Sequence, residues 1–518
     1  MSKKFYLSTA IAYASAIPHI GNVYEAILSD AIVRFKRLDG YDVYFQTGTD
    51  EHGQKIEANA EKQDLSPQAY VDVISSEIKR IYNMMGISYD RFVRTTNSDH
   101  KASVQAIFEK LLAQGDVYLG KYQGWYSVAD ESFISETDIV DGKGPSGDVP
   151  VWTEEDAYFL KLSKYQARLI KHIEENPDFI TPESRKNEVM QNFLKETLPD
   201  LSISRTSFKW GIPVTSDPSH VIYVWIDALS NYITGLGYHP DQPLSENFKK
   251  FWPADYHVIG KDIIRFHVIY WPIILMALGL ELPKHIFAHP WILVDKNKMS
   301  KSVGNVMYTD TLVKHFGIDT VRYYVLHEIP YGQDGNITYE LLIERHNSDL
   351  ANTIGNLVNR TIGMVNKYQQ GLVKKVILAT EPFEYSLKDK ASGLLSSIRT
   401  HIDNMRVGDA LEEIVVLARH ANKYVDLSEP WNLFKNGEHE KLAHVLYSLV
   451  ETIRFIAVGL QPFIPHTAQS ILEQLNVKDG SFASLDTFGN YPEGMIGVAK
   501  VLFERYDLNK KIEGILEG

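Results

Sequence analysis

A change of pattern along the chain constrains the fold more than any other feature. Residues 3–13 alternate as a strand does, residues 23–38 place apolar side chains at helical spacing, and residues 41–45 favour a second strand. Strand, helix and strand in this order predict a parallel sheet with right-handed crossovers, hence an α/β domain. The rhythm returns later, with a strand expected over 256–259, a helix from Asp262 to near Gly279 and a strand over 285–294. Ser66 and Pro67 predict a helix start, as N-cap and first helical residue.

Two other regions break this rhythm. Glycines and prolines interrupt residues 115–221, which indicates an insertion into the first domain, and beyond residue 348 apolar residues keep helical spacing only, which predicts a helical bundle. A chain of 518 residues is also too long for one compact core. We therefore expect five segments: 1–114 and 222–290 as the two halves of the α/β domain, 115–221 as the insertion, 291–348 as a connecting region, and 349–518 as the bundle.

Composition limits the classes of function. The formal charge is −13, so any nucleic-acid contact must come from local basic patches on an acidic body. The absence of cysteine excludes disulfides, thiol catalysis and thiolate metal sites. No targeting sequence is recognisable at the N-terminus, and the most apolar stretch, residues 266–280, is shorter than the ~18 residues of a membrane span. We expect a cytoplasmic protein without a membrane partner.

The first chemical motif is Pro18-His19-Ile20-Gly21-Asn22, at a strand-to-helix turn. Such turns lie at the carboxyl end of the sheet, where α/β folds bind ligands, and the helix N-terminus offers amide dipoles to phosphate. His19 could donate a hydrogen bond to a phosphate oxygen. An ordinary turn relieved by glycine explains the same residues, so this motif alone is a weak signal.

The second motif is Lys298-Met299-Ser300-Lys301-Ser302, in a polar loop that follows a strand. Two lysines and two serines can surround a triphosphate and stabilise the charge that develops on departing pyrophosphate. A solvated lysine and serine loop is the alternative. The two motifs in this order make that alternative much weaker.

The pair resembles the HIGH and KMSKS signatures of class I aminoacyl-tRNA synthetases. Four further segments are similar to methionyl-tRNA synthetases: Thr9-Ala10-Ile11-Ala12-Tyr13, Thr47-Gly48-Thr49-Asp50-Glu51-His52-Gly53, Tyr223-Val224-Trp225-Ile226-Asp227-Ala228 and Gly260-Lys261-Asp262-Ile263-Ile264-Arg265-Phe266-His267. The resemblance implies a Rossmann-like catalytic domain, an inserted connective domain and a helical anticodon-binding domain. The implied activity is ligation of methionine to its tRNA through a methionyl-adenylate.

The resemblance also implies the substrate contacts. Methionine is an unbranched thioether, and its site needs apolar and aromatic walls with few polar groups. The matching positions are Ile11, Tyr13, Trp225, Ala228, Leu229, Tyr232 and His267, with Asp50 as the ligand of the substrate ammonium. Without the family pattern, most of these aromatics would be assigned to the core, and Asp50 to a solvated loop.

For ATP, the resemblance implies contacts from both signatures and from one further acid. His19, Lys298 and Lys301 take the catalytic role, and the wider set of ATP contacts adds Gly21, Asn22, Asp262, Ser300 and Ser302. Mg²⁺ is expected to arrive with ATP as part of the co-substrate, without a dedicated protein cage. No protein nucleophile is needed.

In the bundle, the residues that match anticodon contacts are Asn356, Arg360 and Trp431. Asn356 and Arg360 are four apart and share a helix face, and Trp431 follows Pro430 at an expected helix start, where its ring can stack on an unpaired base. A solvated face and a buried tryptophan are the alternatives. The implied partners are tRNA(Met) and the initiator tRNA, and we expect a monomer.

Two departures from the family pattern stand out. The last histidine of HIGH is Asn22, which puts the detail of the phosphate contact in doubt. Tyr126-Ser127-Val128-Ala129-Asp130 stands where many relatives carry a Cys-x-x-Cys zinc knuckle, so we expect a zinc-free member in which hydrogen bonds and packing replace the metal. The insertion is also too short for the large editing domain of the leucine, isoleucine and valine enzymes.

Three alternatives remain at this stage. The first is another class I synthetase. The second is a catalytically inactive, synthetase-like RNA-binding module, which Asn22 makes conceivable and the intact lysine loop disfavours. The third is a small-molecule nucleotidyltransferase, for which the long helical region would serve no purpose.

Overall fold

The structure is a computed structural model that describes residues 3–129, 132–134, 136–299, 305–378, 383 and 385–516. The chain forms two compact units. The sheet unit comprises residues 1–18 and 42–289, and the helical unit comprises residues 19–41 and 290–518. Helix α1 (Ile20–Leu38) therefore belongs to the helical unit, although both strands that flank it in sequence belong to the sheet unit.

The sheet unit is built on a seven-stranded sheet, whose order is β2-β3-β1-β12-β13-β8 with β4 paired to β3. Every pairing in it is parallel, as the sequence predicts. The strands are β1 (Lys4–Thr9), β2 (Ala12–Tyr13), β3 (Asp42–Asp50), β4 (Arg91–Arg94), β8 (Ile180–Thr181), β12 (Tyr256–Gly260) and β13 (His285–His289). Strand β8 comes from the segment expected as an insertion, and the five predicted segment boundaries stay predictions.

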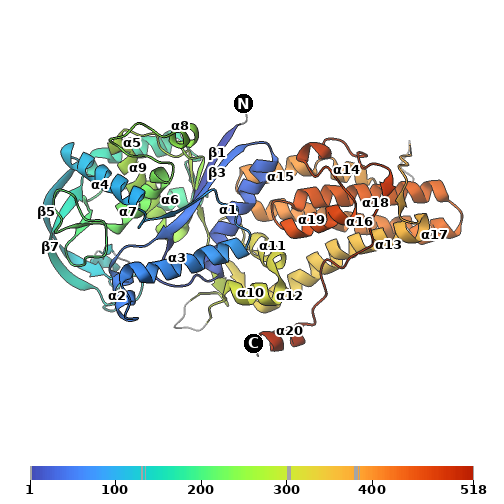
Figure 1. Ribbon diagram of the computed structural model, residues 1–518, viewed down its shortest axis with the longest axis horizontal. Coiled ribbons are helices and arrows are strands. Elements are labelled where there is room, and N and C mark those ends of the chain that lie inside the picture. The colour runs from blue at the N-terminus through green and yellow to red at the C-terminus, as the bar shows by residue number, and fades with distance from the viewer. Residues whose placement is uncertain are drawn as a thin grey trace. The chain divides into compact units, whose positions relative to one another are not determined.

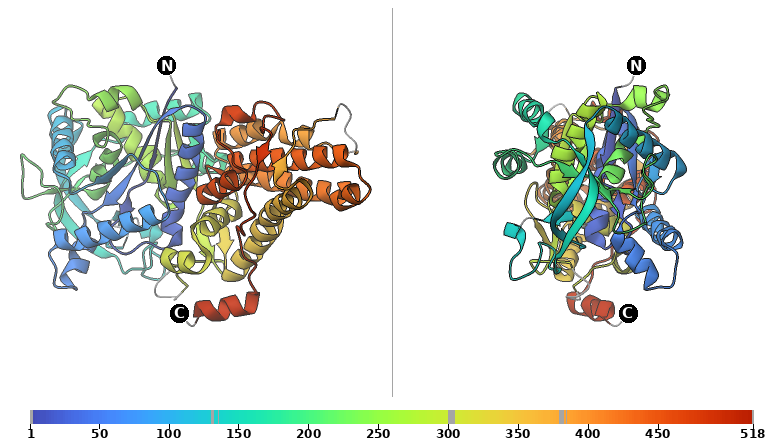
Figure 2. Two further views of the ribbon diagram at one scale, coloured as in Figure 1. Left: turned by 45° about the vertical axis from the view of Figure 1, so that its right-hand side comes forward. Right: turned by 90° about the vertical axis from the view of Figure 1, so that its left-hand side faces the viewer.

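A second, antiparallel sheet contains β6 (Ser132–Ile134), β5 (Val117–Ser127), β7 (Val151–Leu160) and β9 (Leu201–Ser202), and β10 (Ser204–Arg205) pairs with β11 (Val221–Ile222). The long β5–β7 ladder, coloured teal, faces the viewer in the right-hand view of Figure 2. The α-helices of the unit are α2 (Gln54–Glu61), α3 (Pro67–Met84), α4 (Ser98–Ala113), α5 (Ser163–Glu175), α6 (Glu183–Asn192), α7 (Val224–Thr234), α8 (Glu246–Phe251) and α9 (Trp271–Leu278).

Local capping explains several of these boundaries. The Ser66 hydroxyl accepts a hydrogen bond from Ala69 N at 3.2 Å and Pro67 opens α3, which confirms the predicted helix start. Gly279 ends α9 in the left-handed conformation (φ 73°), where a side chain would be strained. The helix expected from Asp262 begins as a 3₁₀ turn (Lys261–Ile263) and a π-helix (Phe266–Tyr270) before α9.

The prediction of one continuous strand over residues 285–294 is wrong. The segment divides into β13 and β14 (Ile292–Val294), and β14 pairs with β15 (Asn297–Lys298) and β16 (Gly335–Ile337) in a separate three-stranded sheet of the helical unit. The break falls at Pro290, whose missing N–H cannot extend a ladder.

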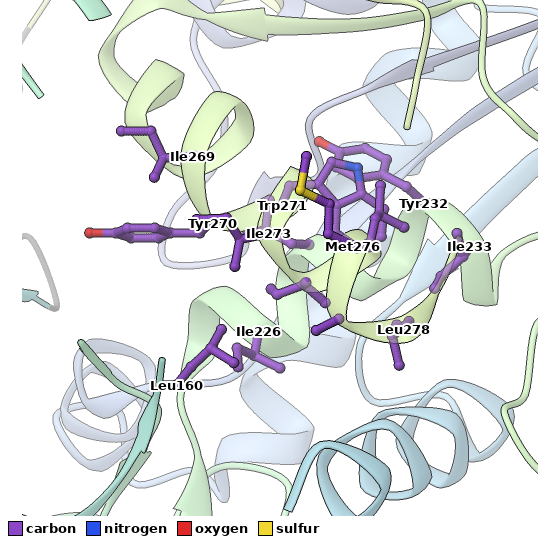
Figure 3. Close-up of a cluster of buried hydrophobic side chains, with 14 of the residues drawn as sticks. Leu160, Ile226, Tyr232, Ile233, Ile269, Tyr270, Trp271, Ile273, Met276 and Leu278 are labelled. Carbon is purple, nitrogen blue, oxygen red and sulfur yellow. The ribbon is translucent and has the colours of Figure 1, made fainter. Parts of the chain in front are cut away.

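An apolar core packs against the parallel sheet, and it includes the labelled side chains of Figure 3. Trp271 lies at its centre and is fully buried. Each large side chain buried in this way contributes about 1.5–3 kcal/mol of transfer free energy. This core holds α7 and α9, the helices that carry or adjoin the expected methionine contacts.

The helical unit confirms the predicted change to helices. Its helices after α1 are α10 (Thr309–Phe316), α11 (Ile318–Glu328), α12 (Tyr339–Arg345), a π-helix (His346–Gly355), α13 (Asn356–Gln369), α14 (Leu387–Ala391), α15 (Leu394–Asp403), α16 (Val407–Ser428), α17 (Pro430–Lys435), α18 (His439–Leu460), α19 (Pro465–Gln474), a 3₁₀ turn (Phe482–Leu485) and α20 (Leu508–Leu516). Short strands β17 (Leu372–Val373) and β18 (Gly494–Met495) also pair. Helices α13, α16, α18 and α19 run alongside one another (Figure 1).

Helix α18 is the one helix in the described part of the chain that is long and apolar enough to cross a membrane. Its whole apolar window is buried inside the helical unit. Packing against neighbouring helices therefore accounts for its composition.

Candidate active site

The first signature forms the N-terminus of α1. His19 is the N-cap, and its Nδ1 accepts a hydrogen bond from Gly21 N at 3.1 Å. In return Asn22 Oδ1 accepts from His19 N at 3.2 Å, which completes a capping box. Asn22, which departs from the family pattern, thus has a structural role, because its carboxamide oxygen accepts the hydrogen bond that completes the cap. The amide dipoles of this 19-residue helix favour an anion at its N-terminus.

Gly21 brings the two signatures together within the helical unit. A Cβ at Gly21 would lie 2.8 Å from Met299 Cε and 3.0 Å from the His19 ring, so Gly21 lies close to the side chains of both signatures. Ile20 N also donates to Met307 O at 3.0 Å, on the other side of the lysine loop. The HIGH-like turn and the KMSKS-like loop are therefore neighbours in space, although about 280 residues separate them in sequence.

Lys298 is exposed at the end of β15, and its Nζ lies 3.3 Å from the centroid of the Trp291 ring. A cation held over an indole face is stabilised by the ring quadrupole. Ser300, Lys301 and Ser302, the other expected ATP contacts of the loop, lie outside the described residues.

On the sheet unit, the register of β2 and β3 brings two expected methionine contacts together. Tyr13 is the direct partner of Asp50, and Ala14 N donates to Asp50 O at 2.8 Å. Gly48 allows β3 to approach β4 and Ile11, since a Cβ there would lie 2.0 Å from Val93 O and 3.0 Å from Ile11 Cγ2. Tyr13 and Asp50 are partly exposed at the carboxyl ends of β2 and β3, and Ile11 is partly exposed between β1 and β2, at the edge where parallel sheets bind ligands.

Helix α7 and the following π-helix carry the remaining expected contacts. Trp225 stacks on Phe266 with ring centroids 3.6 Å apart and planes 5° apart. Tyr232 Oη lies 2.7 Å from His267 Nε2, and Ala228 and Leu229 are buried on the same helix. Phe266 was not among the residues predicted to bind methionine, although it directly precedes His267 in the matched segment. These side chains form an apolar group with one hydrogen-bonded polar pair.

The polar pair is uncharged. Burial lowers the pKa of His267 to about 4, against smaller raising effects of the Ile263 carbonyl and Asp262, so the ring is neutral at pH 7. His267 Nδ1 lies 2.9 Å from the Ile263 carbonyl oxygen, which can only accept, so Nδ1 carries the proton and Nε2 accepts from the Tyr232 hydroxyl. A neutral imidazole suits a thioether, which offers no charge to pair.

Asp262 is exposed on the 3₁₀ turn that follows β12. A Cβ at Gly260 would lie 2.6 Å from Asp262 Oδ1, so glycine allows the carboxylate to fold back over the strand end. The expected ATP contacts are therefore divided between the units, with Asp262 on the sheet unit and the two signatures on the helical unit.

The expected anticodon contacts lie on α13 and α17 of the helical unit. Arg360 donates to Asp426 Oδ1 on α16 at 3.2 Å, and Asn356 precedes it by one helical turn. Trp431 is 40% exposed in the first turn of α17 rather than buried. Phe434, also exposed, stacks on Tyr368 with centroids 4.7 Å apart. The sequence pattern had not singled out this second aromatic pair.

Family models and curated relatives match nearly all of this chain. The family of class I tRNA synthetases (M) matches residues 5–149 and 144–362, and the anticodon binding domain of methionyl tRNA ligase matches residues 379–511. The methionine–tRNA ligase of Clostridium acetobutylicum is 52% identical over 514 residues, which are 99% of this chain and 79% of that protein. The one of Clostridium tetani is 53% identical over 517 residues, 99% of this chain and 80% of that protein.

The chain belongs to the methionyl-tRNA synthetase family.

Solved structures agree. The Mycobacterium tuberculosis methionyl-tRNA synthetase in complex with methionyl-adenylate has a TM-score of 0.91 at 44% identity, over 97% of this chain and all of that one. Its apo form has a TM-score of 0.84 at 41% identity, over 98% and 99% of the two chains. Membership of the synthetase family confirms the fold class and the ligase class that the sequence predicts.

The segment around residues 126–129, where we expected hydrogen bonds in place of a metal, contains hydrogen bonds to Asp148. The buried Ser127 hydroxyl donates to Asp148, with both carboxylate oxygens 2.9 Å away, and Ala129 N donates to Asp148 Oδ2 at 3.2 Å. Asp130 lies outside the described residues. Within the described ranges, no group of three or more His, Cys, Asp or Glu side chains is placed to hold a metal ion.

Proposed function

We propose that the chain acts as a methionine–tRNA ligase, with methionine bound by residues of the sheet unit. One observation carries this proposal. The carboxylate of Asp50 stands in register with Tyr13, and the unit that holds both also holds the neutral Tyr232–His267 pair. A methionine site requires a carboxylate that binds the substrate ammonium and uncharged aromatic side chains that contact its thioether.

In the first step, the methionine carboxylate attacks the α-phosphorus of ATP, a phosphoanhydride bond breaks and pyrophosphate leaves. Two anions approach each other, so positive charge and positioning provide most of the rate acceleration. His19, Lys298 and Lys301 take this role, with Gly21, Asn22, Asp262, Ser300 and Ser302 as further ATP contacts. Mg²⁺ arrives with ATP and spreads the triphosphate charge.

In the second step, a hydroxyl of the terminal adenosine of tRNA attacks the carbonyl carbon of methionyl-adenylate and AMP leaves. The hydroxyl proton passes to a phosphate oxygen of the leaving AMP or to water, and no side chain becomes covalently bonded. The anticodon is recognised through Asn356, Arg360 and Trp431, and both tRNA(Met) and the initiator tRNA are substrates. Base stacking on an exposed indole supports the assignment of Trp431.

We also propose that the enzyme is a cytoplasmic monomer without structural zinc. The Ser127–Asp148 hydrogen bonds support the last point, because they join the two sides of the loop that a metal would otherwise join. A hydroxyl and one carboxylate are also a poor donor set for Zn²⁺, which prefers thiolate and imidazole.

The test is exchange of labelled pyrophosphate into ATP, measured with each of the twenty amino acids. We expect exchange with methionine only. Exchange with cysteine or leucine but not methionine would assign the chain to another class I activity. Binding of tRNA without any exchange would identify an inactive RNA-binding relative.

A further inference from the structure

Asp50 is the last residue of β3, and buried neighbours hold the segment that follows it. Glu51 and His52 come next, and their exposed fractions are 0% and 4%. Glu51 accepts hydrogen bonds from Thr49 Oγ1 at 2.6 Å, from Arg94 Nε at 2.7 Å and from Thr96 Oγ1 at 2.5 Å. These contacts join Glu51 to β3, to β4 and to the turn after β4, but none of them reaches α7.

Asp227 makes the connection to α7. It is fully buried, and its Oδ2 lies 2.6 Å from His52 Nδ1 while its Oδ1 lies 2.7 Å from His100 Nε2 on α4. Burial alone would raise the pKa of Asp227, but the two histidines lower it below its ordinary value, so the carboxylate is ionised and accepts from both rings. Helices α4 and α7 lie side by side in Figure 1. The contact with His100 thus fixes Asp227 Oδ1 independently of His52.

Asp227 lies between two residues expected to line the methionine side chain. Trp225 and Ala228 flank it on α7, with Tyr232 a little more than one turn further on. The strand and this helix are joined at two other levels, by Gln46 Nε2 donating to Asn231 O at 2.9 Å and by Tyr44 Oη donating to Gly235 O at 3.0 Å. The His52–Asp227 contact is the level nearest Asp50, because only Glu51 separates Asp50 from His52 in the sequence.

We propose that His52 and Asp227 form a positioning pair that sets the separation between Asp50 and the apolar side chains of α7. Neither residue touches the substrate. Because Asp50 holds one end of methionine and α7 the other, this separation determines the length of side chain that the enzyme accepts. The inference rests on the proposed function. Misplacement of a binding group by about 1 Å is enough to weaken discrimination strongly.

The alternative is a purely structural role, and it predicts different kinetics. A structural pair would change the melting temperature and lower activity with every substrate in proportion. A positioning pair raises KM for methionine, leaves KM for ATP and kcat at saturating methionine unchanged, and alters preference among thioethers of different length. Ethionine, which is one methylene longer than methionine, is the diagnostic substrate.

Four variants separate these roles, measured by pyrophosphate exchange and thermal denaturation. His52→Leu keeps the volume and removes the donor, whereas His52→Asn restores a donor near the position of Nδ1. His52→Gln keeps a donor but carries it one methylene further out. Tyr6→Phe is the matched control, since it removes a buried 2.8 Å hydrogen bond from Tyr6 Oη to the carbonyl of Tyr232 on the same helix without touching residues 50–53.

For His52→Leu we expect KM for methionine to rise about 10- to 100-fold, the effect of losing one hydrogen bond to a charged group. The preference for methionine over ethionine should fall by about fivefold or more, given the ~1–3 kcal/mol that one methylene is worth. His52→Asn should return both values to within about twofold of wild type, and Tyr6→Phe should leave both unchanged. His52→Gln should move preference towards ethionine.

An unchanged methionine-to-ethionine preference in His52→Leu, or equal changes in that variant and in Tyr6→Phe, would overturn the inference. If His52→Leu is insoluble, His52→Gln alone provides the test. An unchanged preference for methionine over ethionine in His52→Gln would also overturn the inference. Failure of the proposed function is distinguishable, because wild-type enzyme would then show no methionine-dependent exchange before any variant is made.

Discussion

Acidification should destabilise the sheet unit through His267. The pKa of this buried ring is about 4, and its ordinary value is 6.5. Above pH 6.5 the ring is neutral in both the folded and the unfolded chain, so it has no effect on stability. Between pH 6.5 and 4 the unfolded chain gains a proton that the folded chain excludes, so stability is lost as the pH falls through this window.

The two pKa values determine the size of the effect. Moving from pH 7.5 to pH 5.0 costs about 2 kcal/mol, because the unfolded ring is then almost fully protonated and the folded ring almost fully neutral. For a unit of this size, such a loss corresponds to a fall in Tm of about 4–8 °C. Other buried groups also titrate, His257 among them, since burial and then His267 lower its pKa well below the usual value.

A comparison with His267→Gln isolates the contribution of His267. Glutamine does not titrate, and it can donate to the Ile263 carbonyl and accept from the Tyr232 hydroxyl as the imidazole does. We expect the fall in Tm between pH 7.5 and 5.0 to be smaller by about 4–8 °C in the variant than in the wild-type protein. Equal falls in the two proteins, or an imidazole NMR signal of His267 that titrates near pH 6.5, would refute the reasoning.

Further predictions concern the other parts of the site. Asp50→Asn should raise KM for methionine about 10- to 100-fold through loss of the charge-assisted contact, with KM for ATP unchanged in pyrophosphate exchange. Lys298→Ala should lower kcat of exchange about 100-fold while methionine binding by calorimetry persists. Trp431→Ala should raise KM for tRNA in aminoacylation about 5- to 100-fold and leave exchange unaffected. Arg322→Met should destabilise the helical unit by about 3 kcal/mol in thermal denaturation, because it leaves the buried Asp30 carboxylate, now 2.8 Å from Arg322 Nη2, with less positive charge.

Matched variants control these measurements. Asp50→Glu keeps the charge and should recover part of the methionine affinity, whereas an Asp50→Asn enzyme with wild-type KM would remove Asp50 from the site. Trp431→Phe keeps a stacking surface and should be milder than alanine; a tRNA effect equal to that of alanine would argue against stacking. Lys298→Arg keeps the cation, and an arginine variant as impaired as alanine would point to loop folding instead of charge.

Several candidate site residues could be proposed from the sequence because they lie in short contiguous segments. The capped turn at His19 and the strand end at Asp50 each form within a few residues, so the local pattern is sufficient to predict them. The aromatic stack of Trp225 on Phe266 joins segments about 40 residues apart, and neither segment indicates the other. The break at Pro290 was missed because a continuous apolar run does not show which sheet each half joins.

The sequence by itself determined the parallel α/β class of the first part of the chain, the helical class of the last part and the family. Alternation and helical spacing depend on neighbours two to four residues away, and signature residues are read directly. Only the tertiary structure decided that α1 belongs with the helical unit, where Asp30 pairs with Arg322 almost 300 residues later and Asp39 pairs with Arg399 at 2.6 Å. Only the tertiary structure also placed Asp227 between His52 and His100. A buried charge is stable only beside a specific partner, and distance along the chain does not reveal that partner.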